Sequence, residues 1–343
     1  MRPFSLLLLF AIFSLVGSAA LAQSACSPDG CGAPANAIEA NRWPNVRPLS
    51  IDEELLYDRD YRQIEGAFSV YPAPNSLESE TFGSGYTFVT VFEESGEWSR
   101  VGENQWVKSD LLSETIGPSR FAGIVLPLEQ ELPYTVAWTL WHLRGSKTPG
   151  GAEAADNPFL YRYTRVYIYA TVEVNGYHWY QIGPSQWVHQ FKVAKLLPVA
   201  KPAEVDTEKW VSVDLYEQVA IAYEGDRPVF ATLVSSGLEE WPTNEGVFHV
   251  YVRFKRTLMS GAYAQPDFYY IQEVPWTMYF DDQIALHGAY WHDGFGFRRS
   301  HGCVNLTVTD ARWLFNWAES EYDYGNGDLV GPAVYVYSSG KYD

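Results

Sequence analysis

A chain of 343 residues is longer than one ordinary small domain, so two or three folded units are expected. Hydrophobic residues make up 47% of the sequence and aromatic residues 16%, a composition that favours strands, because such side chains pack well on pleated sheets. The net charge of −18 would repel a polyanion, so the sequence predicts no nucleic-acid partner.

Residues 1–22 have the pattern of a secretory signal peptide. Arg2 precedes an apolar run that ends near Val16, and residues 20–22 (Ala-Leu-Ala) form a small-x-small cleavage site. The run is shorter than the roughly 20 apolar residues that span a membrane. We therefore predict cleavage after Ala22, no stable membrane insertion afterwards, and a secreted protein of the periplasm or cell wall.

Residues 23–50 are rich in Ala, Pro, Asn and Ser and lack periodicity, which predicts a linker. Within it, Cys26 and Cys31 are near enough in sequence to pair in an oxidising compartment. Their pairing would leave Cys303 as a free thiol. A free thiol in a secreted protein is either a packed side chain or a working nucleophile, and the neighbours of Cys303 favour the nucleophile.

Residues 51–115 and 116–200 carry a weak internal repeat. The Trp, Val, Gly, Gln, Trp and Val residues of segment 98–107 recur 81 positions later in segment 179–188, with Ile in place of the first Val. Each copy follows the alternating pattern of a half-buried strand, so we predict two small β-barrel repeats, the second with an insertion. The copies loosely resemble bacterial Src-homology-3-like modules. Their tryptophans either fill two small cores or line a groove for a wall peptide.

Residues 209–338 are the predicted catalytic unit. Five strands are expected here, over residues 211–215, 219–223, 229–234, 247–254 and 333–337. After Asn305 the apolar spacing becomes helical, and Thr307 with Asp310 resembles a capping box. Because alternating βαβ units are missing, we predict a mostly β sandwich with one principal helix, from about residue 308 to 320.

His287 and the segment 300–305 (Ser-His-Gly-Cys-Val-Asn) contain the chemistry of this unit. A cysteine attacks as a thiolate, so Cys303 needs a base, which His287 or His301 can supply. A glycine at position 302 lets backbone N–H groups approach a reacting carbonyl and hold its oxyanion. We therefore predict a catalytic set of Cys303, His287, His301 and Gly302.

The pair His287-Gly288 followed by segment 300–305 resembles the signature of the L,D-transpeptidases with a YkuD-type catalytic domain. The resemblance covers residues 209 to about 337 and implies a peptidoglycan enzyme without metal or cofactor. Its donor is a tetrapeptide stem, attacked at the third residue, a diamino acid, with release of the terminal D-alanine. The acyl group then passes from a Cys303 thioester to the side-chain amine of a second stem, giving a 3→3 cross-link, with His287 as general base.

Six further residues are predicted to bind or to position the stem peptide: Tyr290, Trp291, Arg298, Arg299, Ser300 and Asn305. The two arginines can lower the thiol pKa or receive the D-alanine carboxylate, and are otherwise solvated charges. The two aromatic residues lie where the resembling family has a mobile lid. Ser300 and Asn305 are expected to hold the loop by bonds from side chain to backbone.

Several alternatives remain open. His287, His292, Asp293, His301 and Cys303 include enough ligands for zinc, but lack the spacing of a zinc motif. Endopeptidases of the NlpC type place their cysteine before the histidine, which is the opposite order. An L,D-carboxypeptidase would use the same residues with water as acceptor, and a wall-binding scaffold would leave Cys303 unused.

Overall fold

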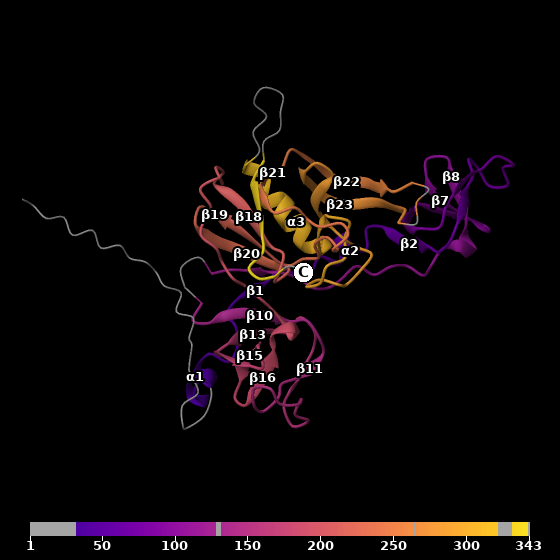
Figure 1. Ribbon diagram of the computed structural model, residues 1–343. Helices are drawn as coiled ribbons and strands as arrows, with labels where there is room; N and C mark the ends of the chain where they lie inside the picture. Colours follow the sequence, from indigo (N-terminus) through magenta and orange to yellow (C-terminus); the bar gives the residue numbers. More distant parts are fainter. Residues whose placement is uncertain (1–31, 128–131, 264, 266, 322–330, 342–343) are drawn as a thin grey trace, which may run out of the picture.

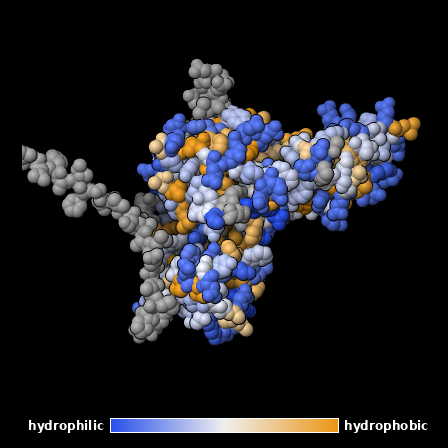
Figure 2. All heavy atoms as spheres, in the orientation of Figure 1, coloured by the Kyte–Doolittle hydropathy of each residue, from blue (hydrophilic) through white to orange (hydrophobic). Residues whose placement is uncertain are grey.

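The computed structural model describes residues 32–127, 132–263, 265, 267–321 and 331–341. The predicted signal peptide, Cys26 and Cys31 lie outside these residues. Figure 1 shows two large sheets at the centre, a lobe around β7 (Trp98–Gly102) and β8 (Gln105–Lys108) to one side, and a lobe around β10 (Thr135–Thr139) and β15 (Tyr177–Gly183) below. Hydrophilic residues predominate on the visible face of the lobe around β7 and β8 (Figure 2). None of the helices in the described part of the chain has the length and hydropathy needed to cross a membrane.

The residues of the internal repeat fold with the same order of strand pairings. In the first copy β2 (Asp60–Ile64) pairs with β5 (Tyr86–Val91), β3 (Phe68–Val70) with β4 (Glu80–Phe82), and β7 with β6 (Glu93–Ser95) and β8. In the second copy β10 pairs with β13 (Arg165–Ile168) and β17 (Val193–Lys195), β11 (Leu143–Arg144) with β12 (Phe159–Leu160), and β15 with β14 (Ala170–Val174) and β16 (Gln186–His189). A short 3₁₀ helix follows in each copy, η1 (Ser109–Leu111) and η2 (Gln190–Lys192). The repeat in sequence is therefore accompanied by a repeat in structure.

The correspondence between the copies extends to single residues. Asn104 and Ser185, which are 81 positions apart, both have a left-handed backbone, with φ of 52° and 50°, in the turns after β7 and β15. The tryptophans do not follow this correspondence: Trp98 and Trp187 are buried, as expected of residues that fill small cores, but their counterparts Trp179 and Trp106 are partly exposed. Closure of the copies into barrels and their identification as Src-homology-3-like modules stay predictions.

Two sheets and the helix α3 (Val308–Trp317) form the centre of the molecule. One sheet has the order β1-β9-β20-β19-β18-β26-β21, and the other has the order β2-β5-β23-β24-β25, with β22 paired to β23. Their remaining strands are β1 (Arg47–Pro48), β9 (Ile124–Val125), β18 (Lys209–Asp214), β19 (Val219–Glu224), β20 (Arg227–Leu233), β21 (Gly246–His249), β22 (Val252–Gly261), β23 (Tyr269–Asp281), β24 (Ile284–Gly288), β25 (Val304–Leu306) and β26 (Ala333–Tyr337). Val213 on β18, Met278 on β23 and Leu314 on α3 belong to one buried cluster. The mostly β fold with few helices is as predicted, while the sandwich stays a prediction.

The strand expected at residues 247–254 is divided between the two sheets. β21 pairs with β26 in one sheet and β22 pairs with β23 in the other, with the buried Val250 between them. The 13-residue strand β23 was not expected from the sequence. Glu273 and Trp276 in this strand have positive φ, 54° and 56°, on either side of Pro275. These kinks break the alternation of buried and exposed positions that a regular strand shows.

Segments assigned to the linker and to the repeats complete the sheets of the C-terminal unit. β1 and β9 extend one sheet beyond β20, and β5 pairs in parallel with β23 of the other. Residues 32–50 are packed rather than extended as a tether: α1 (Ala35–Ala40) buries Ile38, and the Ala33 N–H donates to the side chain of Gln181 at 2.6 Å. A second short helix, α2 (Glu53–Leu56), follows. The predicted boundaries at residues 50 and 115 lie between β1, β5 and β9 along the chain. All three strands belong to the two central sheets, so each of the three predicted segments contributes a strand to them.

The helix α3 begins where the sequence indicates. Thr307 caps it, accepting a bond from the Asp310 N–H at 3.1 Å, and a 3₁₀ helix, η3 (Ala318–Glu321), continues it. In a capping box the carboxylate at this position bonds the backbone N–H of the capping residue, whereas the Asp310 carboxylate interacts with the Thr307 side chain. It is buried and accepts bonds from the Gly123 N–H at 2.8 Å and from the Thr232 hydroxyl at 2.6 Å. Asp310 thus joins the segment before β9 to α3 and β20.

Replacing Asp310 with alanine is expected to lower the free energy of unfolding by about 3 kcal/mol, because two buried donors lose their acceptor. Asp310→Asn, which keeps the shape, is the matched control. Burial raises the pKa of the Asp310 carboxyl from 3.8 to about 6, so between these values the folded protein holds a proton that the unfolded chain has lost. The stability of the wild type should therefore fall as pH rises through this interval, and that of Asp310→Asn should not. Urea unfolding at several pH values measures both effects.

Candidate active site

The parallel pairing of β24 with β25 brings the two parts of the motif together. His287 on β24 lies opposite Asn305 on β25, and Leu286 lies opposite Val304. Cys303 directly precedes β25 and continues its register. Since side chains two positions apart on a strand point to the same face, Cys303 and Asn305 share the face of His287. Cys303 and His287 are then diagonal neighbours, about 7–8 Å apart at their Cα atoms in a regular ladder, a separation that two side chains can close.

A cleft of about 930 Å³ opens on this face. The predicted site residues that line it are His287, Trp291, Arg299, Ser300, His301, Cys303 and Asn305. The cleft is therefore where the structure brings most of the predicted residues together. Gly302, Tyr290 and Arg298 are not among its lining residues.

Cys303 is partly exposed and unpaired. Burial raises the pKa of its thiol to about 11, and the Ala285 backbone N–H opposes this shift. The sulfur lies 3.7 Å from the carbonyl oxygen of Gln283, to which the thiol donates. At neutral pH the resting side chain is therefore a protonated thiol, which must lose its proton before it can attack.

His287 lines the same cleft as Cys303 and is the candidate to take that proton. Its side chain is 2% exposed, and burial lowers its pKa to about 4, so the ring is neutral at neutral pH. Its Nδ1 lies 3.1 Å from the carbonyl oxygen of Gly288. A carbonyl can only accept, so Nδ1 carries the hydrogen, and the lone pair of the neutral ring is on Nε2. The sequence identified Gly288 in the motif but not the use of its carbonyl as the group that fixes this tautomer.

Gly302 shapes the loop that carries Cys303. Its φ is +111°, and a Cβ there would meet the side chain of Ile284 at 3.3 Å. Its N–H donates to the Ser300 hydroxyl at 3.2 Å, and that hydroxyl donates to the carbonyl of Cys303 at 2.5 Å. Its carbonyl accepts from the Thr243 hydroxyl at 2.7 Å. The Gly302 N–H is already bonded, so the backbone N–H groups of its neighbours His301 and Cys303 are the candidate oxyanion donors of this loop.

His301 forms part of an aromatic wall of the cleft. Its ring lies 4.1 Å from the ring of Trp241 and 5.2 Å from that of Tyr269, measured between centroids. Burial lowers the pKa of His301, and the nearby Asp267 acts in the opposite direction. The His301 side chain is therefore described as part of the cleft wall, and its contacts give no reason to include it in proton transfer.

Asn305 is held by His292. The Gly294 N–H donates to Nδ1 of His292 at 3.0 Å, so the hydrogen of the neutral ring is on Nε2. Nε2 lies 3.0 Å from Nδ2 of Asn305, so two donors face each other, while the buried Oδ1 of Asn305 has no partner in the described structure. Turning the carboxamide over exchanges its nitrogen and oxygen and lets the oxygen accept from Nε2. Both nitrogens of His292 are thus used within the protein. The described residues contain no group of three or more His, Cys, Asp or Glu side chains placed to hold a metal ion.

The structure places Tyr290 differently from the sequence prediction. It was predicted to contact substrate, but its ring is fully buried and stacks on Tyr61 at 3.6 Å, and its hydroxyl donates to the Gln272 carbonyl at 2.7 Å. Tyr290 is therefore a core residue. Of the two arginines, Arg299 lines the cleft, whereas Arg298 does not.

Six aromatic residues of the cleft were missed by the sequence analysis: Tyr86, Trp241, Tyr251, Phe268, Tyr269 and Tyr279. Burial is the main cause that raises the pKa of Tyr279 to about 12, and the charge that the nearby Cys303 sulfur carries when ionised adds to it. The same two causes raise the pKa of Tyr269, so both rings lie near the sulfur. Tyr269 and Tyr279 lie on β23, the strand that the sequence did not reveal. Tyr86 comes from the first repeat, so that unit contributes to the cleft wall.

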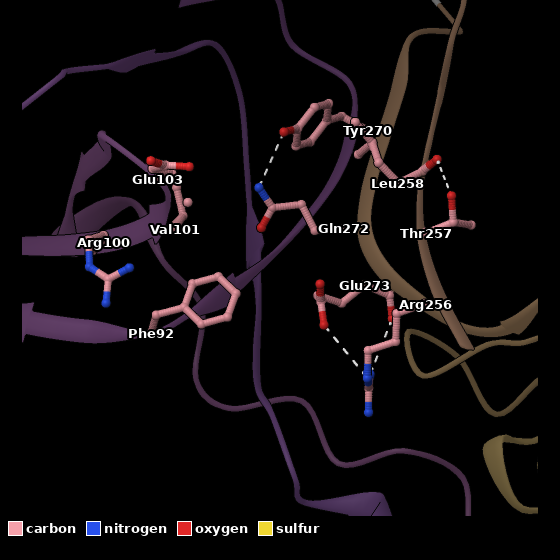
Figure 3. Close-up of a pocket in the computed structure, with 11 residues that line it drawn as sticks. Phe92, Arg100, Val101, Glu103, Arg256, Thr257, Leu258, Tyr270, Gln272 and Glu273 are labelled. Atoms are coloured by element: carbon pink, nitrogen blue, oxygen red, sulfur yellow. Dashed lines mark hydrogen bonds and ion pairs between the residues drawn. The ribbon is translucent and has the colours of Figure 1, made fainter. Parts of the chain in front are cut away.

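A second cavity, of about 520 Å³, lies between the first repeat and the β22–β23 hairpin (Figure 3). Four of its polar side chains are paired with one another: Gln272 donates to the Tyr270 hydroxyl at 3.2 Å, and Arg256 lies 3.6 Å from Glu273. No Cys, His or Ser is among its lining residues. The cleft at Cys303 is therefore the candidate active site.

Known proteins resemble the part of the chain that carries this cleft. Residues 208–336 match the YkuD family model, described as an L,D-transpeptidase catalytic domain, which confirms the family predicted for the C-terminal unit. A putative L,D-transpeptidase of Bacillus subtilis (strain 168), YciB, is 28% identical over 119 residues. The match covers 31% of this chain and 59% of that relative, so the chain spans less than two thirds of its length.

Two solved structures share similar levels of identity. The catalytic domain of an E. faecium L,D-transpeptidase is 25% identical, and the match covers 40% of this chain and 100% of that one, with a TM-score of 0.33. An L,D-transpeptidase (Yku) from Stackebrandtia nassauensis is 24% identical, with coverage of 42% and 62% and a TM-score of 0.32. The two repeats lie outside the residues that match the family model.

Proposed function

We propose that this protein is a secreted peptidoglycan L,D-transpeptidase that forms 3→3 cross-links through a thioester on Cys303. The observation that carries the proposal is the pairing of β24 with β25. It places a neutral His287, whose Nδ1–H is bound by the Gly288 carbonyl, on the same strand face as the only free cysteine of the described residues. The match of residues 208–336 to the catalytic-domain family supports the same reading.

The first half of the reaction transfers an acyl group to the enzyme. Nε2 of His287 takes the thiol proton as the sulfur of Cys303 attacks the carbonyl carbon of the third residue of a tetrapeptide stem. The developing oxyanion is held by the backbone N–H groups of His301 and Cys303, each donor contributing roughly 3 kcal/mol. The carbon–nitrogen bond then breaks, His287 returns the proton to the leaving D-alanine amine, and the thioester remains.

The second half passes the acyl group to an acceptor. The side-chain amine of another stem attacks the thioester and gives a proton to His287. The carbon–sulfur bond then breaks, and His287 passes this proton to the departing sulfur, which restores the Cys303 thiol and the neutral ring. The aromatic wall of Tyr86, Trp241, Tyr269, Tyr279 and Trp291 favours a cleft filled by peptide rather than by water, which supports an amine acceptor. Arg299 on the same wall can bind the carboxylate of D-alanine. The scheme needs neither metal nor cofactor.

Incubation of the protein starting at Gln23 with a defined tetrapeptide stem, followed by mass spectrometry of the products, tests this proposal. A cross-linked dimer that has lost one D-alanine is expected. A trimmed tripeptide without dimer would instead identify an L,D-carboxypeptidase. Unchanged stem, together with no covalent adduct on Cys303 after treatment with a carbapenem, would leave only the wall-binding scaffold. Cell fractionation for the processed chain outside the cytoplasm tests the proposed location.

A further inference from the structure

The loop of residues 289–299, which connects His287 to the cysteine segment, is bonded to the second repeat. The Tyr163 hydroxyl donates to the backbone carbonyl of Asp293 at 2.9 Å and faces its carboxylate at 3.3 Å. The Ser119 hydroxyl donates to the same carboxylate at 2.5 Å. The Arg162 guanidinium donates to the Phe295 carbonyl at 3.2 Å and lies 4.0 Å from the Asp293 carboxylate. In Figure 1 the lobe that contains β10 and β13 lies directly against the central sheets.

Apolar contacts continue the same attachment. The ring of Trp141 lies 5.3 Å from that of Phe297, and a Cβ on Gly296 would meet the Leu140 side chain at 2.4 Å. Within its own unit the loop is held by the Ser235 hydroxyl, which donates to the Gly294 carbonyl at 3.1 Å, and by the N–H groups of Gly296 and Arg299, which donate to the carbonyls of Val234 and Ser236 at 2.8 and 2.9 Å. The described bonds to the carbonyl and the carboxylate of Asp293 all come from the repeat, so Asp293 is the point of the loop that the repeat holds.

The backbone of Tyr163 is itself unusual. Its φ is +69°, in the left-handed region that non-glycine residues rarely adopt. The turn keeps this conformation through the bond from the Tyr163 N–H to the Thr139 carbonyl at 2.7 Å, and the Tyr163 ring packs on Phe121 with centroids 4.5 Å apart. Such conformations persist where the surrounding structure requires the side chain in one place, and here that place is beside Asp293.

The loop carries three side chains that the cleft depends on. Trp291 and Arg299 line it, and His292 holds Asn305, which lies opposite His287 in the strand pairing. A change in the position of Asp293 therefore moves Trp291 and His292, which precede it in the loop, and Arg299, which follows it. Arg162 and Tyr163 touch none of the reacting atoms in this arrangement, so any effect they have must pass through the loop.

We propose that Arg162 and Tyr163 of the second repeat are positioning residues, which keep the loop 289–299 in the conformation that completes the substrate cleft. The proposal deepens the proposed function, on which it rests for the role of the cleft. In this arrangement the repeat is a working part of the enzyme. A protein in which the loop is released should bind donor only in the fraction of molecules whose loop is docked, and its apparent affinity falls by that fraction.

The test uses the full chain with Arg162→Met and Tyr163→Phe combined. Methionine keeps the aliphatic stem, and phenylalanine keeps the ring on Phe121, so the loop bonds are lost while packing is kept. Tyr161→Phe is the matched control, because this neighbouring tyrosine is 67% exposed and its ring contacts only residues of the repeat among the described contacts. Circular dichroism and thermal unfolding establish that all variants are folded, and Tyr163→Phe alone is used if the double variant is not.

Amide hydrogen exchange in residues 289–299 should become about tenfold faster in the double variant, as expected for the loss of two to three modest hydrogen bonds. The KM for the tetrapeptide donor should rise by the inverse of the docked fraction, about tenfold when one molecule in ten has a docked loop, while kcat stays within about twofold, since saturating donor draws the loop back to its docked position. The control should match the wild type in both measurements.

Loop exchange that stays within about twofold of the wild type would overturn the proposal. So would a fall in kcat with KM unchanged, because that result places the two residues in the chemistry or the general stability of the fold. Exchange does not depend on turnover. If the wild type does not act on stems, but loop exchange is faster in the double variant, the proposed function is wrong and the role of Arg162 and Tyr163 in holding the loop stands. If the wild type acts on stems, but loop exchange is the same in the double variant, the proposed function stands and the positioning role is wrong.

Discussion

Replacing Cys303 with alanine is expected to abolish cross-linking and to leave the fold unchanged. The sulfur is the atom that carries the acyl group, and a methyl group cannot form the thioester, so kcat should fall by roughly 10⁶-fold, as when other enzymes lose a covalent nucleophile. The side chain is only partly buried, so its removal leaves no large cavity, and the melting temperature should change little. Turnover of the tetrapeptide stem, followed by mass spectrometry, measures the first effect.

The matched control for this variant removes the other two cysteines. A protein with Cys26→Ser and Cys31→Ser should keep its cross-linking activity and should still gain one carbapenem adduct, because neither residue belongs to the unit that carries the cleft. The Cys303→Ala protein should gain none. Cross-linking that survives in Cys303→Ala but disappears in the control would transfer the nucleophile to the N-terminal segment and end the present interpretation.

The sequence points to the candidate site through a signal that is local. Segment 300–305 encodes its own conformation: Gly302 permits a φ of +111°, and the Ser300 hydroxyl closes the loop onto Cys303. Thr307 likewise starts α3 through a bond that spans three residues. The sequence of β18 alternates apolar with polar residues around Val213, and β26 around Val334 is a run of Val and Tyr, so both strands too could be located without partners.

What the sequence could not reveal depends on contacts distant along the chain. β23 contains Pro275 between two residues of left-handed backbone, so its period of two is broken and its role between β5 and β24 is set by those partners. Tyr290 follows β24 with no periodic pattern, and only its stacking on Tyr61, which is 229 positions earlier, makes it a core residue. β1 and β9 are two-residue strands with no sequence signature.

The second large effect is expected at His287. Replacement with asparagine keeps a polar side chain but removes the base, and should lower kcat/KM for the donor by about 10³–10⁴-fold at neutral pH. The loss should depend on pH. In the wild type the base is ineffective only when protonated, so the rate should fall as pH drops through about 4 and should be level well above it. The Cys303 thiol, with a pKa of about 11, then remains protonated until His287 removes the proton.

Without the base, Cys303 reacts only through the small fraction of thiolate that bulk water allows. That fraction rises tenfold per pH unit until the pKa near 11, so log kcat/KM of His287→Asn should climb with a slope of about one from neutral pH to about pH 10. His301→Asn is the matched control, because its ring packs between Trp241 and Tyr269, and it should keep the level profile. Initial rates measured between pH 5 and 10 distinguish the roles of the two histidines. This range ends about one unit above the pKa of His287 and about one unit below that of Cys303. A sloping profile for His301→Asn with a level one for His287→Asn would make His301 the base, because the variant that has lost its proton acceptor is the one that must depend on hydroxide.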